Sequence, residues 1–418
     1  MCYDSLDIFQ HREMFKMYIA VMGYGTVGAG VVKVLKMNRD HIARKSRHGA
    51  IDVKHILEIR DVTDENAHLV TKNFDDILND KEVHVVVETM GGIHPAFDFV
   101  SACLKAGKSV VTSNKELVAE KGLELLMLAR ANQVNFTFEA SVAGGIPIIR
   151  PLSGSLNGNI IEEVAGIING TTNFILTKMI NENMSYSDAL KIAQDNGYAE
   201  KDPTADVEGL DACRKICILS ALAYGKHVHP RQVYTEGISK LELKDTEYAS
   251  ELGYVIKLLG RSKRVGDKIC VTVSPCLVKK ESLLACVSGV NNAVLVRANA
   301  VGEIMMYGPG AGMMPTASAV VGDVIDCCNH YMRPKFFGWS EDAGDDFIEN
   351  HLDVPTRLFI RVGSGADKDR IKSEFGDVKL VEKDDLAFIT PVGTERELRI
   401  KAENLGCEIK SVITVTDY

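Results

Sequence analysis

The chain of 418 residues is 46% hydrophobic and 25% charged, with a formal net charge of -9, which is the balance of a globular protein of about two to four domains. The acidic charge argues against a nucleic-acid partner or an anionic membrane surface, and no apolar run reaches the ~20 residues that cross a bilayer. The ten cysteines show no zinc spacing, so we expect free thiols in a reducing cytoplasm.

The first 150 residues alternate between strand-like and helix-like patterns. Residues 1–16 contain no apolar signal core and are expected to be a short N-terminal extension. The apolar run 17–22 ends in a glycine turn, and helical spacing follows it. Further strands are expected at 53–59, 84–90, 109–113 and 134–141, with helices at 96–107 and 122–133. Such alternation predicts an α/β fold with a Rossmann-type, doubly wound parallel sheet.

The rest of the chain has a different pattern. Residues 160–171 alternate as a strand with one solvated face does, helices are expected at 185–197 and 209–225, and strands follow over 268–300. A glycine loop then leads into a helix within 308–330, and the acidic stretch 338–354 is interpreted as a linker. Residues 355–418 show the order βαββαβ, which predicts a ferredoxin-like C-terminal domain.

The glycine turn is the first candidate site. Gly23, Gly25 and Gly28 follow a strand and open a helix, which is typical of pyrophosphate binding, although a turn without a ligand would have the same pattern. An acidic residue at the end of the second strand favours the ribose of NAD, whereas an arginine favours the phosphate of NADP. Glu58 and Arg60 share a strand face there. The interpretation favours NADP through Arg60 and leaves NAD open.

Three further segments are candidates. Lys115 follows a strand, where the carboxyl ends of parallel strands face the ligand crevice, but a lysine in solvent can also begin a helix. Asp211 and Lys215 share a helix face after a carboxylate-rich loop, and a surface salt bridge would look the same. The glycine-rich segment 139–150 fits either a close approach to a ligand or a hinge.

One segment resembles the signature of the homoserine dehydrogenases. Its matching residues are Ala193, Gly197, Tyr198, Ala199, Asp202, Pro203, Asp206, Val207, Gly209, Asp211 and Lys215. Motifs at 23–28, 88–92, 113–119, 140–149 and 169–176 are also similar to that family, in the right order. The resemblance runs from about residue 17 to about residue 335, and residues 355–418 resemble an ACT regulatory domain.

The resemblance implies an NAD(P)-dependent interconversion of aspartate 4-semialdehyde and homoserine by hydride transfer. Lys115 and Lys215 would flank the reacting carbonyl, and Asp211 would orient Lys215. Glu200 and Asp206 would hold the ammonium or hydroxyl group of the substrate. The pyrophosphate would bind at Gly23, Gly25, Thr26, Val27 and Gly28. A sodium ion would be ligated by Glu139, Val142, Gly144 and Ile146.

The implied organisation is a monofunctional cytoplasmic enzyme, a homodimer or homotetramer. Its cofactor domain would span 17–150 and be completed by about 305–335, its catalytic and dimerisation domain would span 151–304, and threonine would bind the C-terminal domain at the loop 363–367. Two alternatives remain. One is a different dinucleotide-dependent dehydrogenase of an amino-acid-derived carbonyl, which the signature at 193–215 disfavours. The other is a non-catalytic sensor of NADP or an amino acid, which the two lysines disfavour.

Overall fold

The computed structural model describes residues 16–418, so the expected N-terminal extension lies outside the described residues, apart from Lys16. The chain forms two compact units. The first contains residues up to 117 together with 124–140 and 316–335, and the second contains 118–123, 141–315 and 336–418. Among the described residues, no helix has the length and apolar character needed to cross a membrane.

The first unit contains a six-stranded parallel sheet in the order β3-β2-β1-β4-β5-β6. Its strands are β1 (Met17–Met22), β2 (Ile51–Leu57), β3 (Val70–Thr71), β4 (Val83–Glu88), β5 (Ser109–Thr112) and β6 (Phe136–Thr137). Its helices are α1 (Thr26–Met37), α2 (Arg39–Lys45), α3 (Asp75–Leu78) and α4 (Ala96–Lys105), with most of α5 (Lys115–Ala131) and most of α11 (Met313–Asn329). This strand order confirms the predicted doubly wound sheet.

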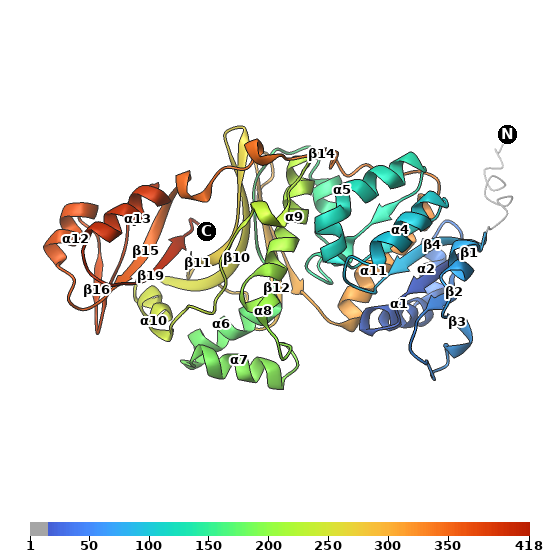
Figure 1. The fold of residues 1–418 in the computed structure, drawn as a ribbon, viewed down its shortest axis with the longest axis horizontal. Helices are drawn as coiled ribbons and strands as arrows, with labels where there is room; N and C mark the ends of the chain where they lie inside the picture. The colour runs from blue at the N-terminus through green and yellow to red at the C-terminus, as the bar shows by residue number, and fades with distance from the viewer. Residues whose placement is uncertain (1–15) are drawn as a thin grey trace, which may run out of the picture. The chain divides into compact units, whose positions relative to one another are not determined.

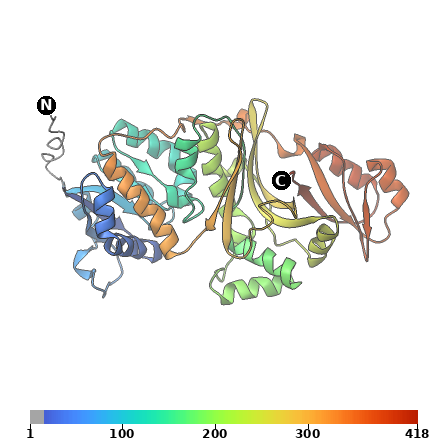
Figure 2. The ribbon, with the colours of Figure 1, turned by 180° about the vertical axis from the view of Figure 1, so that it is seen from behind.

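Helices cover both faces of this sheet. Figure 1 shows α4 and α5 on one face, and Figure 2, from behind, shows α11 in orange on the other. Side chains tie α11 and the residues after it to the last strand, because Asn135 donates to the carbonyl of His330 at 3.1 Å and accepts from the Lys335 amide at 2.9 Å. The strand expected at 134–141 is shorter, since the Glu139 amide donates to Asp323 and not to a neighbouring strand.

The second unit contains an 11-stranded sheet. Its central strands are β7 (Ile161–Ile167), β10 (Tyr254–Val265), β11 (Lys268–Lys279), β12 (Asn291–Ala298) and β13 (Gly302–Pro309), with the short β9 (Tyr234–Thr235) beside β11. Its helices before the C-terminal segment are α6 (Gly170–Glu182), α7 (Tyr186–Asp195), α8 (Thr204–Val207), α9 (Leu210–Tyr224) and α10 (Leu243–Glu251). Helix α9, which packs on β7, β10 and β11, carries the predicted catalytic lysine.

The expectation of a solvated face on β7 is wrong. Every residue of this strand is buried except Glu162. The reason is a second layer of apolar side chains, because Ala165 and Ile167 pack in one cluster with Leu284 and Val287. The loop that supplies this cover lies more than 100 residues away in the chain, so the local alternation could not predict it.

The C-terminal segment forms the predicted βαββαβ order. Its elements are β15 (Pro355–Val362), α12 (Lys368–Phe375), β16 (Leu380–Glu382), β17 (Leu386–Ile389), the two-residue β18 (Gly393–Thr394), α13 (Glu395–Asn404) and β19 (Ile409–Val415). The strands lie in the antiparallel order β19-β15-β17-β16. Strand β19 also pairs with β11, so this sheet continues the central one.

The segment 338–354 packs against the residues that follow α9. Strand β14 (Glu341–Asp342) pairs with β8 (Lys226–His227), and the buried Trp339 ring stacks on His227 with centroids 5.3 Å apart. Nε2 of the His229 ring lies 3.0 Å from Oδ2 of Asp342, within hydrogen-bonding distance. This stretch, interpreted as a linker, therefore has ordered contacts along its length.

A buried arginine connects the C-terminal segment to α10. Arg361 is 1% exposed and donates to Asp245 at 2.8 Å, Asp385 at 2.6 Å and Glu242 at 2.6 Å. Asp245 and Asp385 are themselves buried. A guanidinium in a low-dielectric position is stable only when its charge is compensated in place. The pairing therefore holds β15 against α10.

Replacing Arg361 by methionine should lower the free energy of unfolding by about 3–5 kcal/mol, because Asp245 would remain buried without its counter-charge. Urea unfolding measures this change. Arg396→Met on α13 is the matched control, because its ion pair with Asp353 is solvent-exposed and should contribute little. Similar midpoints for the two variants would contradict the structural role given to Arg361.

Candidate active site

The glycine turn after β1 has the backbone geometry that its sequence predicts. Gly23 has φ +91°, and its amide donates to the Leu57 carbonyl at 2.9 Å. A Cβ on Gly28 would lie 2.0 Å from the Gly23 carbonyl oxygen, so any side chain there would separate the turn from α1. Helix α1 begins at Thr26, directly after Gly25. Its first amides can therefore face an anionic group.

A cavity of about 440 Å³ lies beside this turn. It is lined by Gly23, Gly25, Leu57, Glu58, Ile59, Arg60, Lys72, Phe74, Thr89, Met90, Pro95 and Phe99. Its volume lies within the ~300–1,000 Å³ of small-molecule sites. Its position at the carboxyl ends of β1, β2 and β4 is where doubly wound sheets bind dinucleotides.

Glu58 and Arg60 form an ion pair on the wall of this cavity. The Arg60 guanidinium donates to both oxygens of Glu58 at 3.0 and 2.8 Å, and the Tyr24 amide donates to the same carboxylate at 2.9 Å. Hydrogen bonds from the Arg60 side chain lower the pKa of Glu58 to about 2. Glu58, the candidate for ribose binding, and Arg60, the candidate for phosphate binding, therefore both line the same cavity.

Lys115 is the first residue of α5, at the carboxyl end of β5. The N-cap residue Asn114 accepts from the Leu117 amide at 3.1 Å, and its own amide group donates to the Gly92 carbonyl at 2.6 Å. The buried Glu88 accepts from Thr112 at 2.5 Å, and burial raises its pKa. These polar contacts fix the ends of β4 and β5, and with them the start of α5.

In the second unit, Lys215 and Asp211 form a buried pair on α9. Lys215 is 9% exposed and Asp211 4% exposed, which excludes the surface salt bridge that the spacing alone allowed. The Lys215 ammonium donates to Asp211 Oδ2 at 2.7 Å and to the Ile168 carbonyl at 2.7 Å. Asn169 donates from its amide nitrogen to Asp211 at 2.9 Å and to Asp206 at 2.7 Å. Three of the predicted residues thus lie in one hydrogen-bonded cluster.

The segment before α8 lies beside this cluster. Thr171 donates to the Tyr198 carbonyl at 2.7 Å, which ties α6 to the predicted signature. Glu200 is exposed, and its carbonyl accepts from Gln194.

Asn169 belongs to this hydrogen-bonded cluster, although the sequence interpretation assigned it no role. It begins α6 as the N-cap and accepts from the Thr172 amide at 2.9 Å. Its signal was present, because the motif at 169–176 contributes to the family resemblance. The bridge to Asp211 spans 42 residues of sequence, however, and no local spacing indicates such a contact.

The glycine turn and its cavity define a dinucleotide-dependent enzyme, and the buried lysine with its carboxylates supplies groups for proton transfer. Residues 147–325 match the family model described as homoserine dehydrogenase, and residues 23–139 match the model of its NAD-binding domain. The chain belongs to the homoserine dehydrogenase family. A homoserine dehydrogenase of Bacillus subtilis is 44% identical over 415 residues, which are 96% of this chain and 91% of that protein.

Solved structures agree with this membership. A homoserine dehydrogenase from Thiobacillus denitrificans aligns with a TM-score of 0.88 and 37% identity over 96% of this chain and 98% of that one. A hyperthermophilic archaeal homoserine dehydrogenase in complex with NADPH aligns with a TM-score of 0.64 and 27% identity over 75% of this chain and 97% of that one. The protein is an oxidoreductase that uses a nicotinamide cofactor to interconvert aspartate 4-semialdehyde and homoserine.

Asn169→Ser should keep the helix cap but lose the amide that joins Asp206 to Asp211. We expect kcat/KM for homoserine oxidation to fall at least ~10-fold, a cost of about 1.4 kcal/mol in transition-state stabilisation, with NADPH affinity unchanged. The control is Ser185→Ala, which removes the cap of α7. It should lower the melting temperature and leave kcat/KM unchanged. Wild-type kinetics for Asn169→Ser would contradict the positioning role.

Proposed function

We propose that Lys215 supplies the proton that the carbonyl oxygen takes up during reduction of aspartate 4-semialdehyde. A bound dihydronicotinamide would supply the hydride, and its addition to the aldehyde carbon would leave negative charge on the carbonyl oxygen. An ammonium beside this oxygen stabilises the charge and delivers the proton, directly or through a water. The single observation that carries this role is the burial of the Lys215–Asp211 pair.

The remaining polar residues would position the substrate. Asp206 and Glu200 are proposed to hold the substrate ammonium or hydroxyl group, and Asp211 to orient Lys215. Lys115 is proposed as the second lysine at the carbonyl, because it lies at the carboxyl end of β5.

NADP is the proposed cofactor, and NAD remains the alternative. Arg60 and Lys72 both line the cavity beside the glycine turn, so two cations are available to a 2′-phosphate. The ionised carboxylate of Glu58 would repel a 2′-phosphate, but its negative charge is compensated by Arg60. The glycine turn with Thr26 and Val27 would hold the pyrophosphate through backbone amides.

A sodium ion is proposed at Glu139 and the carbonyls of Val142, Gly144 and Ile146. All of these donors are oxygen atoms, as hard cations require. Ala143 and Gly144 have φ values of 57° and 55°, and the chain turns sharply there. A Cβ on Gly144 would lie 2.4 Å from the Gly310 carbonyl oxygen, so glycine is required at this turn.

We further propose a cytoplasmic homodimer or homotetramer with the domain limits predicted from the sequence, inhibited by threonine through residues 355–418. At the loop expected to bind it, 363–367, the Asp367 side chain already accepts from the Asp369 and Arg370 amides at 2.9 and 3.4 Å. A ligand carboxylate at this helix terminus would therefore have to displace a carboxylate of the protein.

Lys215→Ala should reduce turnover at least ~100-fold, as expected for loss of a general acid, and should leave NADPH affinity nearly unchanged. Stopped-flow absorbance of NADPH with aspartate 4-semialdehyde, together with fluorescence titration of NADPH, measures the two quantities. The control is Lys191→Ala, which removes another lysine–aspartate pair of the same spacing, exposed on α7. Turnover of Lys215→Ala within a few-fold of wild type would refute the assignment.

Arg60→Ala should weaken NADPH binding about ten- to a hundredfold more than NADH binding, the range of a charge-assisted hydrogen bond. Glu58→Gln should shift the preference in the opposite direction, because it removes the negative charge that Arg60 now compensates. Dissociation constants for both cofactors on both variants test this pair of effects. An equal loss of NADH and NADPH binding in Arg60→Ala would place the 2′-phosphate elsewhere.

A further inference from the structure

Lys257 is a second buried lysine of the second unit, and its charge is not paired with a carboxylate. It lies on β10 and is 3% exposed. Its ammonium donates to the Val287 carbonyl at 2.6 Å and to Asn173 Oδ1 at 3.4 Å. Within residues 16–418, no ion pair joins Lys257 to an aspartate or glutamate, whereas Lys215 is paired with Asp211. The positive charge of Lys257 is therefore compensated by the dipoles of neutral groups.

The burial of Lys257 works against the folded state. An ammonium taken out of water costs several kcal/mol unless a counter-charge replaces its hydration. Burial lowers the pKa of Lys257 to about 8, because neutral oxygens replace that hydration only in part. Its neighbours in the sheet are apolar, since Leu259 on the same strand and Cys276 opposite it belong to one buried cluster. An apolar side chain would suit this position, so stability does not account for the lysine.

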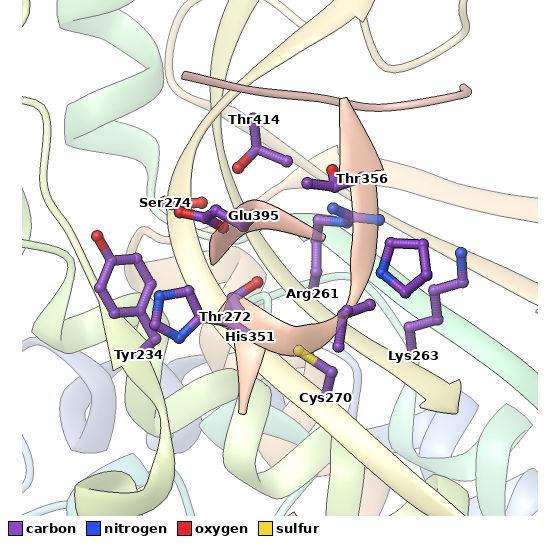
Figure 3. Close-up of a pocket in the computed structure, with 12 residues that line it drawn as sticks. Tyr234, Arg261, Lys263, Cys270, Thr272, Ser274, His351, Thr356, Glu395 and Thr414 are labelled. Atoms are coloured by element: carbon purple, nitrogen blue, oxygen red, sulfur yellow. The ribbon is translucent and has the colours of Figure 1, made fainter. Parts of the chain in front are cut away.

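Two other basic residues of β10 have an anion or a cavity beside them. Arg261 donates to Glu163 at 2.9 Å. Figure 3 shows Arg261 and Lys263 at a chamber of about 60 Å³, which both residues line. Lys257 has neither kind of neighbour among the described residues of its surroundings, so its contacts with Val287 and Asn173 are the ones that a function must use.

Asn173 is the residue that Lys257 orients. It is 1% exposed, and its backbone amide donates to the Asn169 carbonyl at 3.3 Å in the first turn of α6. A side-chain amide can turn either its oxygen or its nitrogen toward a neighbour, whereas an ammonium can only donate. Because Lys257 faces the oxygen, the amide nitrogen of Asn173 faces the loop 287–291. This nitrogen donates at 3.3, 3.0 and 3.1 Å to three backbone carbonyls, those of Val287, Gly289 and Asn291.

The loop 287–291 packs against the start of α6. A Cβ on Gly170, the first residue of the helix, would lie 2.8 Å from the Val290 carbonyl oxygen. The two backbones are therefore in close contact, and a displacement of the loop must displace the residue that follows Asn169. The side chain of Asn169 donates to Asp206 and Asp211. A continuous set of contacts thus leads from Lys257 to the candidate active site.

We propose that Lys257 is a positioning residue for the substrate. It holds Asn173 in one orientation and the loop 287–291 in one place, and this fixes the turn of α6 from which Asn169 reaches its two carboxylates. The inference rests on the proposed function of Asp206 as a substrate ligand. Its effect should therefore appear in KM more than in kcat, because Lys257 acts on the substrate ligand and not on the proton donor Lys215.

Lys257→Met in the full-length protein tests this role. We expect the KM for homoserine to rise at least ~5-fold, with kcat within about twofold of wild type and NADPH affinity unchanged. The melting temperature should equal or exceed that of the wild type, because an uncompensated buried charge is removed. Lys257→Gln keeps an N–H donor and should have an intermediate KM. The control is Lys280→Met, since Lys280 also donates to a backbone carbonyl but is exposed; its KM should be that of the wild type.

A double-mutant cycle with Asn169→Ser separates positioning from general loss of structure. Because both substitutions act on the same amide group, the double variant should be about as impaired as Asn169→Ser alone. The proposal is overturned by a wild-type KM in Lys257→Met, by a rise in KM that comes with a lower melting temperature, or by additive effects in the cycle. Lys215→Ala, measured in the same assay, reports separately on the proposed proton transfer.

Discussion

A lysine ammonium taken out of water requires a counter-charge in the same place, and much of the second unit is arranged around that requirement. Lys215 meets it with Asp211 and the Ile168 carbonyl. Asp211 in turn requires the amide of Asn169, which also begins α6. The buried charge of Lys215 therefore connects three segments, which are the start of α6, the middle of the signature and the first turns of α9. Positioning of the proposed proton donor and stability of the fold depend on the same contacts.

The first unit must bind an anionic cofactor although the protein as a whole carries a net negative charge. Local backbone geometry, and not net charge, therefore has to favour binding. Gly23 and Gly28 allow the turn to contact the helix, and the first amides of α1 are the proposed donors to the pyrophosphate. Glu58 and Arg60 then place opposite charges in the same cavity. Under the proposed assignment, cofactor preference depends on the difference between two neighbouring interactions, and a single substitution is expected to change it.

The C-terminal segment is joined to the catalytic part of the second unit in two ways. Strand β19 pairs with β11, which makes one continuous sheet, and Arg361 connects β15 to α10 through buried ion pairs. Strand β11 pairs with β9 at residues 272–273 and with β19 at residues 276–277, so its partner changes where this continuous sheet divides.

The sequence by itself determined the features that depend on local chemistry. The glycine turn, the alternation of strands and helices, the βαββαβ order and the spacing of Asp211 and Lys215 are all encoded within a few residues. Only the tertiary structure decided that β7 is covered on both faces, that Asn169 joins two carboxylates, and that Glu58 pairs with Arg60 on the wall of one cavity. Burial and charge pairing come from segments distant in the chain or from side-chain directions, and local periodicity contains no information about either.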